Sequence, residues 1–294
     1  MFDIIVIGGT NIDIKAKASA THLAGTSNPG EITFTPGGVA RNIAHNLAAL
    51  NVNTALISLI GNDATGEIAF AATSAAGVDL SMTARSTIAT GAYVALLDEK
   101  GELVSAVNDM RILDDLKPDM LRPYAINLAA TKFIVVDCNV PIELLEWLAQ
   151  HYGAKLVVEP VSVTKSQKLQ QVLQNHTVYL ATPNRDQLVA LGTDLHGRGL
   201  QNMVLHMGEE GALISTSSTS HRIPSLATAK IKDVTGAGDA AVAGLVYGLL
   251  KGFSLIESAR LGQAAASLVV NSTSSTAVGL SEAQLLTLVE ASHE

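Results

Sequence analysis

Short apolar runs alternate with longer amphipathic segments along this 294-residue chain, and the alternation limits the possible folds more than any single motif does. It is most regular between residues 118 and 206. There we expect helices over 118–128, 141–151 and 163–173, and strands over 132–137, 155–159, 177–180 and 203–206. Strands that alternate with helices form parallel sheets with both faces covered. The sequence therefore predicts the α/β class, as a three-layer, Rossmann-like, mostly parallel sheet flanked by helices.

The two ends of the chain follow the same pattern. Residues 3–7 form a continuous apolar run, which is typical of a strand buried on both faces. Elsewhere we expect a helix from Gly37 to Leu50, a strand over 54–60, a helix over 65–76, and helices over 240–250, 254–270 and from Ser281 onward. No linker is long enough to separate two domains, so we expect a single domain over 1–294.

Two segments, about 10–36 and 86–112, interrupt the alternation. In the second, the apolar runs of residues 91–97 and 101–107 flank Asp98-Glu99-Lys100, a pattern that predicts a β-hairpin. Residues 31–35 are expected to form a short strand, next to the turn at Asn28-Pro29-Gly30. These segments predict a small β lid over the active face. An inert insertion and a dimer contact are the alternatives.

Composition excludes several classes of protein. The net charge is −8 and no long cluster of Lys or Arg occurs, which argues against nucleic acid as a partner. Cys138 is the only cysteine, so an intrachain disulfide is impossible and a reducing compartment is expected. The apolar runs are too short to span a bilayer, and the N-terminus has no basic segment. We expect a cytoplasmic protein without a membrane partner.

The sequence T-G-A-G-D at residues 235–239 precedes a compact apolar helix. Glycines allow a ligand to approach the backbone closely, and a helix N-terminus presents unpaired N–H donors and a positive potential. Asp239 is placed to remain ionised and to accept a proton from an attacking hydroxyl. This turn predicts a phosphoryl-transfer site.

Other interpretations of the turn remain open. Asp239 could simply favour the helix N-terminus, a gain of about 0.3–1 kcal/mol. Gly236, Gly238 and Ala241 also satisfy the dinucleotide pattern G-x-G-x-x-A, and Glu257 has the spacing of its acidic residue. That pattern requires a second strand where residues 254–270 indicate a helix. The P-loop pattern G-x-x-x-x-G-K-[ST] does not occur in the chain.

Two separated motifs resemble the signatures of one enzyme family. G-G-V-A-R-N at residues 37–42 and D-V-T-G-A-G-D at residues 233–239 are similar to the two signatures of the ribokinase-like, or PfkB, sugar and nucleoside kinases. Gly61, Asp63 and Gly66 match the family's G-x-D-x-x-G element, whose role is expected to be structural. The resemblance extends over essentially the whole chain.

The resemblance implies a role for each matching residue. Asp239 would be the catalytic base that activates a primary hydroxyl, and Gly236, Ala237 and Gly238 would form the anion hole for the γ-phosphoryl group. The implied contacts to the sugar are Asn11, Asp13, Gly38, Asn42 and Asn139. The residues implied along ATP are Asn184, Gly208, Gly211, Thr235 and Asn271. Asp233 and Thr235 resemble positions that bind a monovalent cation such as K⁺ in some members. A homodimer through the lid strands is implied as well.

One departure from the family concerns Mg²⁺. Where the family has N-x-x-E, this chain has Asn184-Arg185-Asp186-Gln187, so a carboxylate that helps to organise the metal is replaced by an amide. Gln187 and Glu159 are the predicted metal residues. Mg²⁺ could be held mostly by ATP phosphates and Asn184, Glu159 or Asp186 could compensate, or the kinase could be weakened.

Five short stretches resemble the branch of the family that phosphorylates the 5′-hydroxyl of pseudouridine. They lie at residues 11–15, 27–30, 106–110, 136–141 and 159–165. A uracil joined through carbon carries a free ring N–H that uridine lacks, so Asn108 or Asp109 in the lid is a candidate acceptor. A hairpin end that faces water is the alternative for both residues.

Other functions remain open. The same chemistry could act on ribose, adenosine or a fructose phosphate, although Arg41 alone is little support for a phosphorylated acceptor. The chain could instead be a non-catalytic nucleoside or sugar sensor, or more remotely a nicotinamide-dependent enzyme.

Overall fold

An eight-stranded sheet forms the centre of the molecule. The computed structural model describes residues 1–226, 236–270, 276 and 279–291. The strands of the sheet are β1 (Ile4–Ile7), β4 (Thr54–Ile57), β9 (Phe133–Asp137), β10 (Leu156–Glu159), β11 (Val178–Ala181), β12 (Leu200–His206), β13 (Ala212–Thr216) and β14 (Ser220–Ile223). Their order is β14-β13-β12-β11-β10-β9-β1-β4, and neighbours from β12 to β4 run parallel. The predicted fold class is confirmed.

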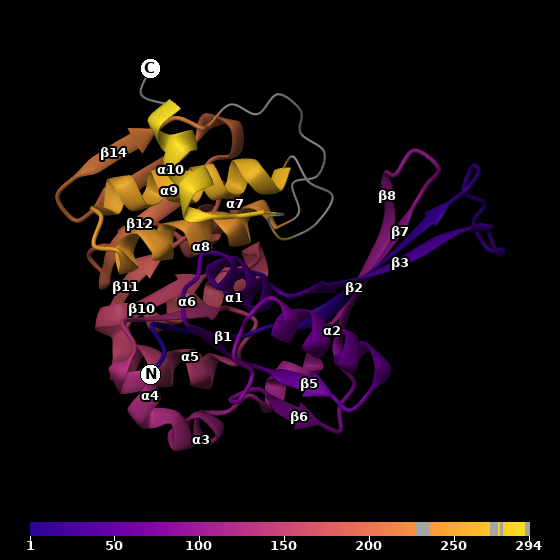
Figure 1. Ribbon diagram of the computed structural model, residues 1–294, viewed down its shortest axis with the longest axis horizontal. Coiled ribbons are helices and arrows are strands. Elements are labelled where there is room, and N and C mark those ends of the chain that lie inside the picture. The colour runs from indigo at the N-terminus through magenta and orange to yellow at the C-terminus, as the bar shows by residue number, and fades with distance from the viewer. Residues whose placement is uncertain (227–235, 271–275, 277–278, 292–294) are drawn as a thin grey trace.

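Side chains of the central strands alternate between two cores. In β1, Ile4 and Val6 join one core, and Ile5 and Ile7 join the other; all four are fully buried. The first core is covered by α1 (Val39–Ala49), α8 (Ala237–Leu250), α9 (Leu255–Val270) and α10 (Glu282–Ala291). The second is covered by α5 (Ile142–Tyr152), α6 (Val163–Val172) and α7 (Arg185–Leu191), with shorter helices beside them (Figure 1). Full burial of each such aliphatic side chain contributes about 1.5–3 kcal/mol, which holds the three layers together.

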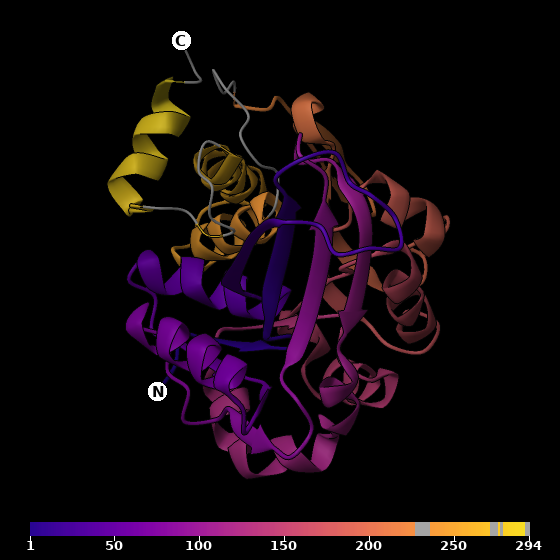
Figure 2. The ribbon, with the colours of Figure 1, turned by 90° about the vertical axis from the view of Figure 1, so that its right-hand side faces the viewer.

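A second, four-stranded sheet is built from the two segments that interrupt the alternation. Its strands are β2 (Asn11–Ala18), β3 (Gly30–Gly37), β7 (Gly91–Leu97) and β8 (Leu103–Asp109), in the order β3-β2-β7-β8. The predicted hairpin is confirmed as β7 and β8. The sheet projects from the body of the molecule, and its strands lie side by side in Figures 1 and 2. Asn11 and Asp13 lie at the start of β2, where this sheet joins the body of the molecule.

Two predicted elements are interrupted. The helix expected over 118–128 is divided into α3 (Pro118–Leu121), a 3₁₀ turn (Arg122–Tyr124) and α4 (Ala125–Ala130). Pro123 lacks the N–H that a helix interior needs, and its ring clashes with the preceding turn, which accounts for the break. The strand expected over 54–60 leaves the main sheet after β4; its end, β5 (Leu59–Gly61), pairs with β6 (Ala84–Ser86).

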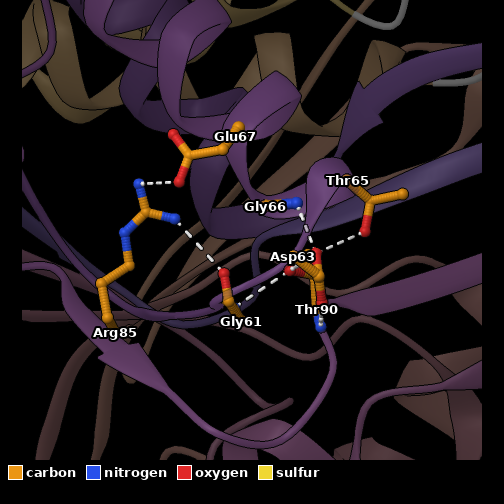
Figure 3. A network of polar contacts seen from close by, with 7 residues as sticks. All are labelled: Gly61, Asp63, Thr65, Gly66, Glu67, Arg85 and Thr90. Carbon is orange, nitrogen blue, oxygen red and sulfur yellow. Dashed lines mark hydrogen bonds and ion pairs between the residues drawn. The ribbon is translucent and has the colours of Figure 1, made fainter.

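Asp63 caps α2 (Ala64–Ala75) and ties it to the chain ahead of β7. Its carboxylate accepts hydrogen bonds from the Gly66 and Thr90 amides, both at 2.7 Å, and from the Thr65 and Thr90 hydroxyls (Figure 3). Burial alone would raise the pKa of Asp63, but these bonds outweigh it and lower the pKa to about 2. The G-x-D-x-x-G element therefore has a structural role: it fixes the start of α2 against the chain that leads into β7.

Among the described residues, no helix has the length and apolarity needed to cross a membrane.

Candidate active site

Helix α8 begins in a glycine turn, as the sequence predicts. Gly236 is its N-cap and adopts the left-handed conformation, with φ of 80°. Ala237, Gly238 and Asp239 form the first turn, where N–H groups have no intrahelical acceptor. A Cβ built on Gly238 would meet no atom of the described residues within 4 Å, apart from the helix's own backbone, so this part of the chain leaves that face of the turn open. The arrangement leaves room for an anion against the helix N-terminus.

Asp239 joins the two predicted signatures. The Asn42 amide on α1 donates a 2.8 Å hydrogen bond to the Asp239 carboxylate, across 197 positions in the sequence. Burial raises the pKa of Asp239 well above its usual value, and the carboxylates of Glu159, Asp137 and Asp13 add to the shift, whereas the Asn42 bond opposes it. A carboxylate with a raised pKa is a stronger base than an ordinary aspartate, as proton abstraction from a hydroxyl requires.

The ends of β1 and β9 meet at Asp137. This buried carboxylate accepts hydrogen bonds of 2.9 Å from the backbone amides of Gly9, Ala40 and Asn139. It therefore holds together the turn after β1, the start of α1 and the end of β9. The Asn139 side chain in turn accepts a short hydrogen bond from Lys165.

The start of β2 supplies the other predicted sugar contacts. Asn11 donates a 2.8 Å hydrogen bond to Asp13, and burial raises the pKa of the Asp13 carboxyl. Gly38 caps α1 with φ of 103°, and a Cβ there would collide with the Gly9 backbone. Gly38 is thus required by the close approach of two backbone segments. Of the predicted sugar contacts, Asn42 bonds Asp239 directly and Asp13 acts on it through its charge, whereas Asn11 bonds Asp13 and Asn139 bonds Lys165.

Glu159 ends β10, near Asp239. It accepts hydrogen bonds from the Thr182 hydroxyl at 2.6 Å and from the Val161 amide at 3.1 Å. Burial raises the pKa of Glu159 to about 7, despite both bonds. Burial therefore disfavours the charged form of this side chain.

A cavity of about 270 Å³ adjoins the start of α8. Its lining includes Ala237, Gly238 and Ala241 from α8, Gly208 and His206 from the end of β12, and Val270 from α9. Within the part of the chain that the structure describes, the buried His206 Nε2 atom has no hydrogen-bond partner, and burial lowers the pKa of His206 to about 4. A mostly apolar cavity lined by the start of a helix and by an imidazole fits a nucleotide, whose base would take the apolar part and whose phosphates would take the helix N–H donors.

The residues predicted along the nucleotide and metal divide into three groups. Asn184 and Gln187 form a capping box for α7, in which the Gln187 oxygen accepts from the Asn184 amide at 2.8 Å. Gly208 lines the cavity, whereas a Cβ on Gly211 would collide with the β14 backbone. The predicted roles of Asp233, Thr235 and Asn271 lie outside the described residues.

Among the described residues, no three His, Cys, Asp or Glu side chains form a group able to hold a metal ion. Mg²⁺ commonly binds through substrate phosphates and one or two protein groups, so it does not require such a cluster.

Three residues beside this site were not among the predicted site residues. Arg41 and Lys165 lie within motifs quoted above, and their charge is the feature of the sequence that could have identified them as site residues. His206 had no signal beyond its position after an apolar strand.

Comparison with known proteins identifies the family of the chain. The signature described as pfkB family carbohydrate kinase matches residues 1–282. Pseudouridine kinase of Escherichia coli K12 is 33% identical, and the aligned region covers 98% of this chain and 96% of that enzyme. Guanosine-inosine kinase of Exiguobacterium acetylicum is 25% identical, covering 93% and 96%.

Two solved structures share the fold. A carbohydrate kinase from Agrobacterium tumefaciens has a TM-score of 0.87 at 28% identity, over 99% of this chain and 97% of that one. Ribokinase from Thermotoga maritima has a TM-score of 0.87 at 19% identity, over 99% and 100%. The chain therefore belongs to the pfkB family of carbohydrate kinases, with a ribokinase-like fold, and is an ATP-dependent sugar or nucleoside kinase.

Proposed function

We propose that this kinase transfers the γ-phosphoryl group of ATP to the 5′-hydroxyl of pseudouridine. The observation that carries the phosphoryl-transfer chemistry is the 2.8 Å hydrogen bond from Asn42 to Asp239, which joins the acceptor and phosphate motifs at the open N-terminus of α8. Asp239 takes the hydroxyl proton, and the amides of Gly236, Ala237 and Gly238 stabilise the charge on the transferred group.

Mg²⁺ is proposed to enter bound to the ATP phosphates, where it neutralises their charge. Gln187 and Glu159 remain the predicted protein groups near it, although both already accept hydrogen bonds within the protein. A K⁺ ion at Asp233 and Thr235 also remains a prediction.

Pseudouridine is favoured by the small sheet as well as by the similarity to the E. coli enzyme. Asp13, Tyr93 and Asn108 are paired across β2, β7 and β8, so their side chains share one face. Adjacent strands lie about 4.8 Å apart, which places Asn108 about 10 Å from Asp13. A ribose at Asp13 would bring its base towards Tyr93 and Asn108, where an aromatic ring and an amide could recognise it.

The alternative hydrogen-bond acceptor in the lid and the alternative substrates fit less well. Asp109 is engaged by Arg111 through bonds of 2.9 and 2.6 Å, which leaves Asn108 as the candidate acceptor for the ring N–H. Arg41, the candidate for binding a sugar phosphate, is only 3% exposed and donates to other protein groups. A purine nucleoside, the substrate class named by the Exiguobacterium relative, is the second candidate.

The direct test is an ADP-release assay with pseudouridine, uridine, adenosine, inosine, ribose and fructose 6-phosphate. We expect the highest kcat/KM for pseudouridine. Highest efficiency with any other acceptor would contradict the proposed substrate and leave the kinase assignment intact. Acceptor binding without ADP formation at saturating Mg²⁺ and ATP would instead indicate a sensor.

Replacement of Asn108 by Leu is expected to lower kcat/KM for pseudouridine about tenfold and to leave uridine turnover nearly unchanged. The reason is the loss of one hydrogen-bond acceptor for the N–H that only pseudouridine carries. Ser105→Ala, on the opposite face of the same strand, is the matched control. An equal loss for both nucleosides would show that Asn108 does not recognise this N–H.

We also propose a homodimer through the other face of the small sheet. Phe34, Ile14, Val94 and Val107 are paired across its four strands, and Phe34 and Val107 are 52% and 68% exposed. A self-complementary apolar face of this kind suits a two-fold interface. Sedimentation should give a dimer for the wild type and a monomer for Val107→Glu; a wild-type monomer at micromolar concentration would refute the proposal.

A further inference from the structure

Arg41 lies inside the protein, one residue before Asn42, the partner of the predicted base. It is only 3% exposed, on the first turn of α1. Its Nε donates to the Thr73 hydroxyl at 3.1 Å, and one terminal nitrogen donates to the Pro36 carbonyl at 3.3 Å. These contacts fix the plane of the guanidinium. Burial lowers the pKa of Arg41 to about 10, so it keeps its charge at neutral pH.

The second terminal nitrogen of Arg41 lies 3.2 Å from Nδ1 of His45. Because a guanidinium can only donate, Nδ1 must be the acceptor and the His45 ring must be neutral. Burial, and then the Arg41 charge, lower the pKa of His45 to about 4, in agreement with that assignment. The positive charge in this cluster therefore resides on Arg41.

The remaining contact leads to the base. Arg41 Nη1 donates to Asn42 Oδ1 at 3.1 Å, while Asn42 Nδ2 donates to Asp239 at 2.8 Å. A side-chain amide can present either its oxygen or its nitrogen to a neighbour. A donor-only guanidinium on one side leaves a single choice: the oxygen faces Arg41, and the nitrogen faces Asp239.

We propose that Arg41 is a positioning residue that locks the Asn42 amide so that it donates to Asp239 and thereby keeps the base ionised. This inference rests on the proposed role of Asp239. Without Arg41 the amide is free to flip, and its oxygen would then face the carboxyl and favour the protonated acid. A protonated Asp239 cannot accept the proton of the acceptor hydroxyl.

The lock matters because the other charged groups act in the opposite sense. The carboxylates of Glu159 on β10, Asp137 on β9 and Asp13 on β2 all disfavour a negative charge on Asp239. On α1, Arg41 is the cation and His45 is neutral, and Lys165 on α6 faces Asp137. Among the described residues, the hydrogen bond that the Asn42 amide donates to Asp239 opposes these carboxylates by lowering the pKa of Asp239.

The test is the pH dependence of kcat/KM for Arg41→Met, with Thr73→Val as the matched control. Thr73→Val removes one anchor of Arg41 but leaves its contacts to Pro36, His45 and Asn42, which still fix the guanidinium, so its profile should follow the wild type. In Arg41→Met we expect the acid limb to move up by about one pH unit, equivalent to one charge-assisted hydrogen bond. The rate would be about tenfold lower on that limb and would be regained at higher pH. A loss of equal size at every pH would overturn the proposal, because it would indicate a purely structural role.

A carboxyl ¹³C titration of ligand-free protein separates this inference from the proposed function. The Asp239 signal is identified by its absence in Asp239→Asn, and its pKa should rise in Arg41→Met. An unchanged Asp239 titration in an active enzyme would refute the lock alone. A raised titration with an unchanged rate profile would confirm the lock and refute Asp239 as the base. If Arg41→Met does not fold, Arg41→Lys, which can still donate to one acceptor, should show a smaller shift in the same direction.

Discussion

The Asp239→Asn variant is expected to lose about 10²- to 10⁴-fold in kcat, the usual contribution of a general base. Its fold and its nucleotide binding should persist, because an asparagine oxygen can still accept the Asn42 hydrogen bond. The measurement is ADP release with pseudouridine, together with an ATP titration. Asp119→Asn, which removes an exposed carboxylate paired with Arg122, is the control and should leave turnover unchanged. If Asp239→Asn keeps most of its activity, Asp239 is not the base.

The same substitution should stabilise the protein. The pKa of Asp239 is raised in the folded state, so the native protein binds a proton that the unfolded chain releases above about pH 4. The carboxyl group therefore costs stability as the pH rises through its folded pKa. Asp239→Asn removes this cost, and its gain in melting temperature should be small at pH 4 and increase towards pH 8. A variant that melts below the wild type at pH 8 would show that the carboxylate is well accommodated.

The Gly238→Ala variant is expected to lose about 10²- to 10³-fold in kcat, the effect of disabling one donor of an anion hole. The added methyl group would point into open space beside the α8 N-terminus, where the phosphoryl group is proposed to lie. Because no atom of the described residues, apart from the helix's own backbone, lies within 4 Å of that methyl, folding should not suffer. Replacing a helical glycine by alanine should even stabilise the protein by about 0.5–1 kcal/mol.

Gly244→Ala, on the same helix, is the matched contrast. A Cβ at Gly244 would lie 2.6 Å from the Leu261 carbonyl oxygen, so this variant should lose about 1–3 kcal/mol of unfolding free energy. Its turnover per folded molecule should remain close to that of the wild type. Denaturant unfolding and ADP release, measured on both variants, separate the two effects. Wild-type turnover by Gly238→Ala would mean that no phosphoryl group contacts this face of the turn.

The strand and helix pattern could be predicted because it depends on burial, which leaves a direct trace in the sequence. Ile4 to Ile7 are apolar without interruption because both faces of β1 are covered. The glycine turn before α8 could be predicted for a similar reason, since Gly236 adopts a left-handed conformation that favours glycine. Two local predictions were wrong. Pro123 interrupts a helix whose apolar spacing continues past it. Leu59 to Gly61 leave the main sheet, although their sequence continues the apolar run of a strand.

The polar network around Asp239 could be predicted only in part. Asn42 and Asp239 stand in recognisable motifs, but nothing in their spacing shows that they share a hydrogen bond. The part played by Arg41 depends on which atoms its guanidinium reaches, and a sequence contains no such information. His206 is similar: its unsatisfied nitrogen follows from the cavity between β12, α8 and α9. Sites that combine side chains from distant strands need tertiary structure before their chemistry can be assigned.

The central claim is that the N-terminus of α8 holds the transferred phosphoryl group and that Asp239 deprotonates the acceptor. A crystal structure with pseudouridine, Mg²⁺ and a non-hydrolysable ATP analogue tests it most directly. We predict the 5′-oxygen within about 2.6–3.2 Å of the Asp239 carboxylate, with the terminal phosphate against the amides of Gly236 to Gly238. A 5′-oxygen directed away from Asp239, or phosphates bound elsewhere, would contradict the claim.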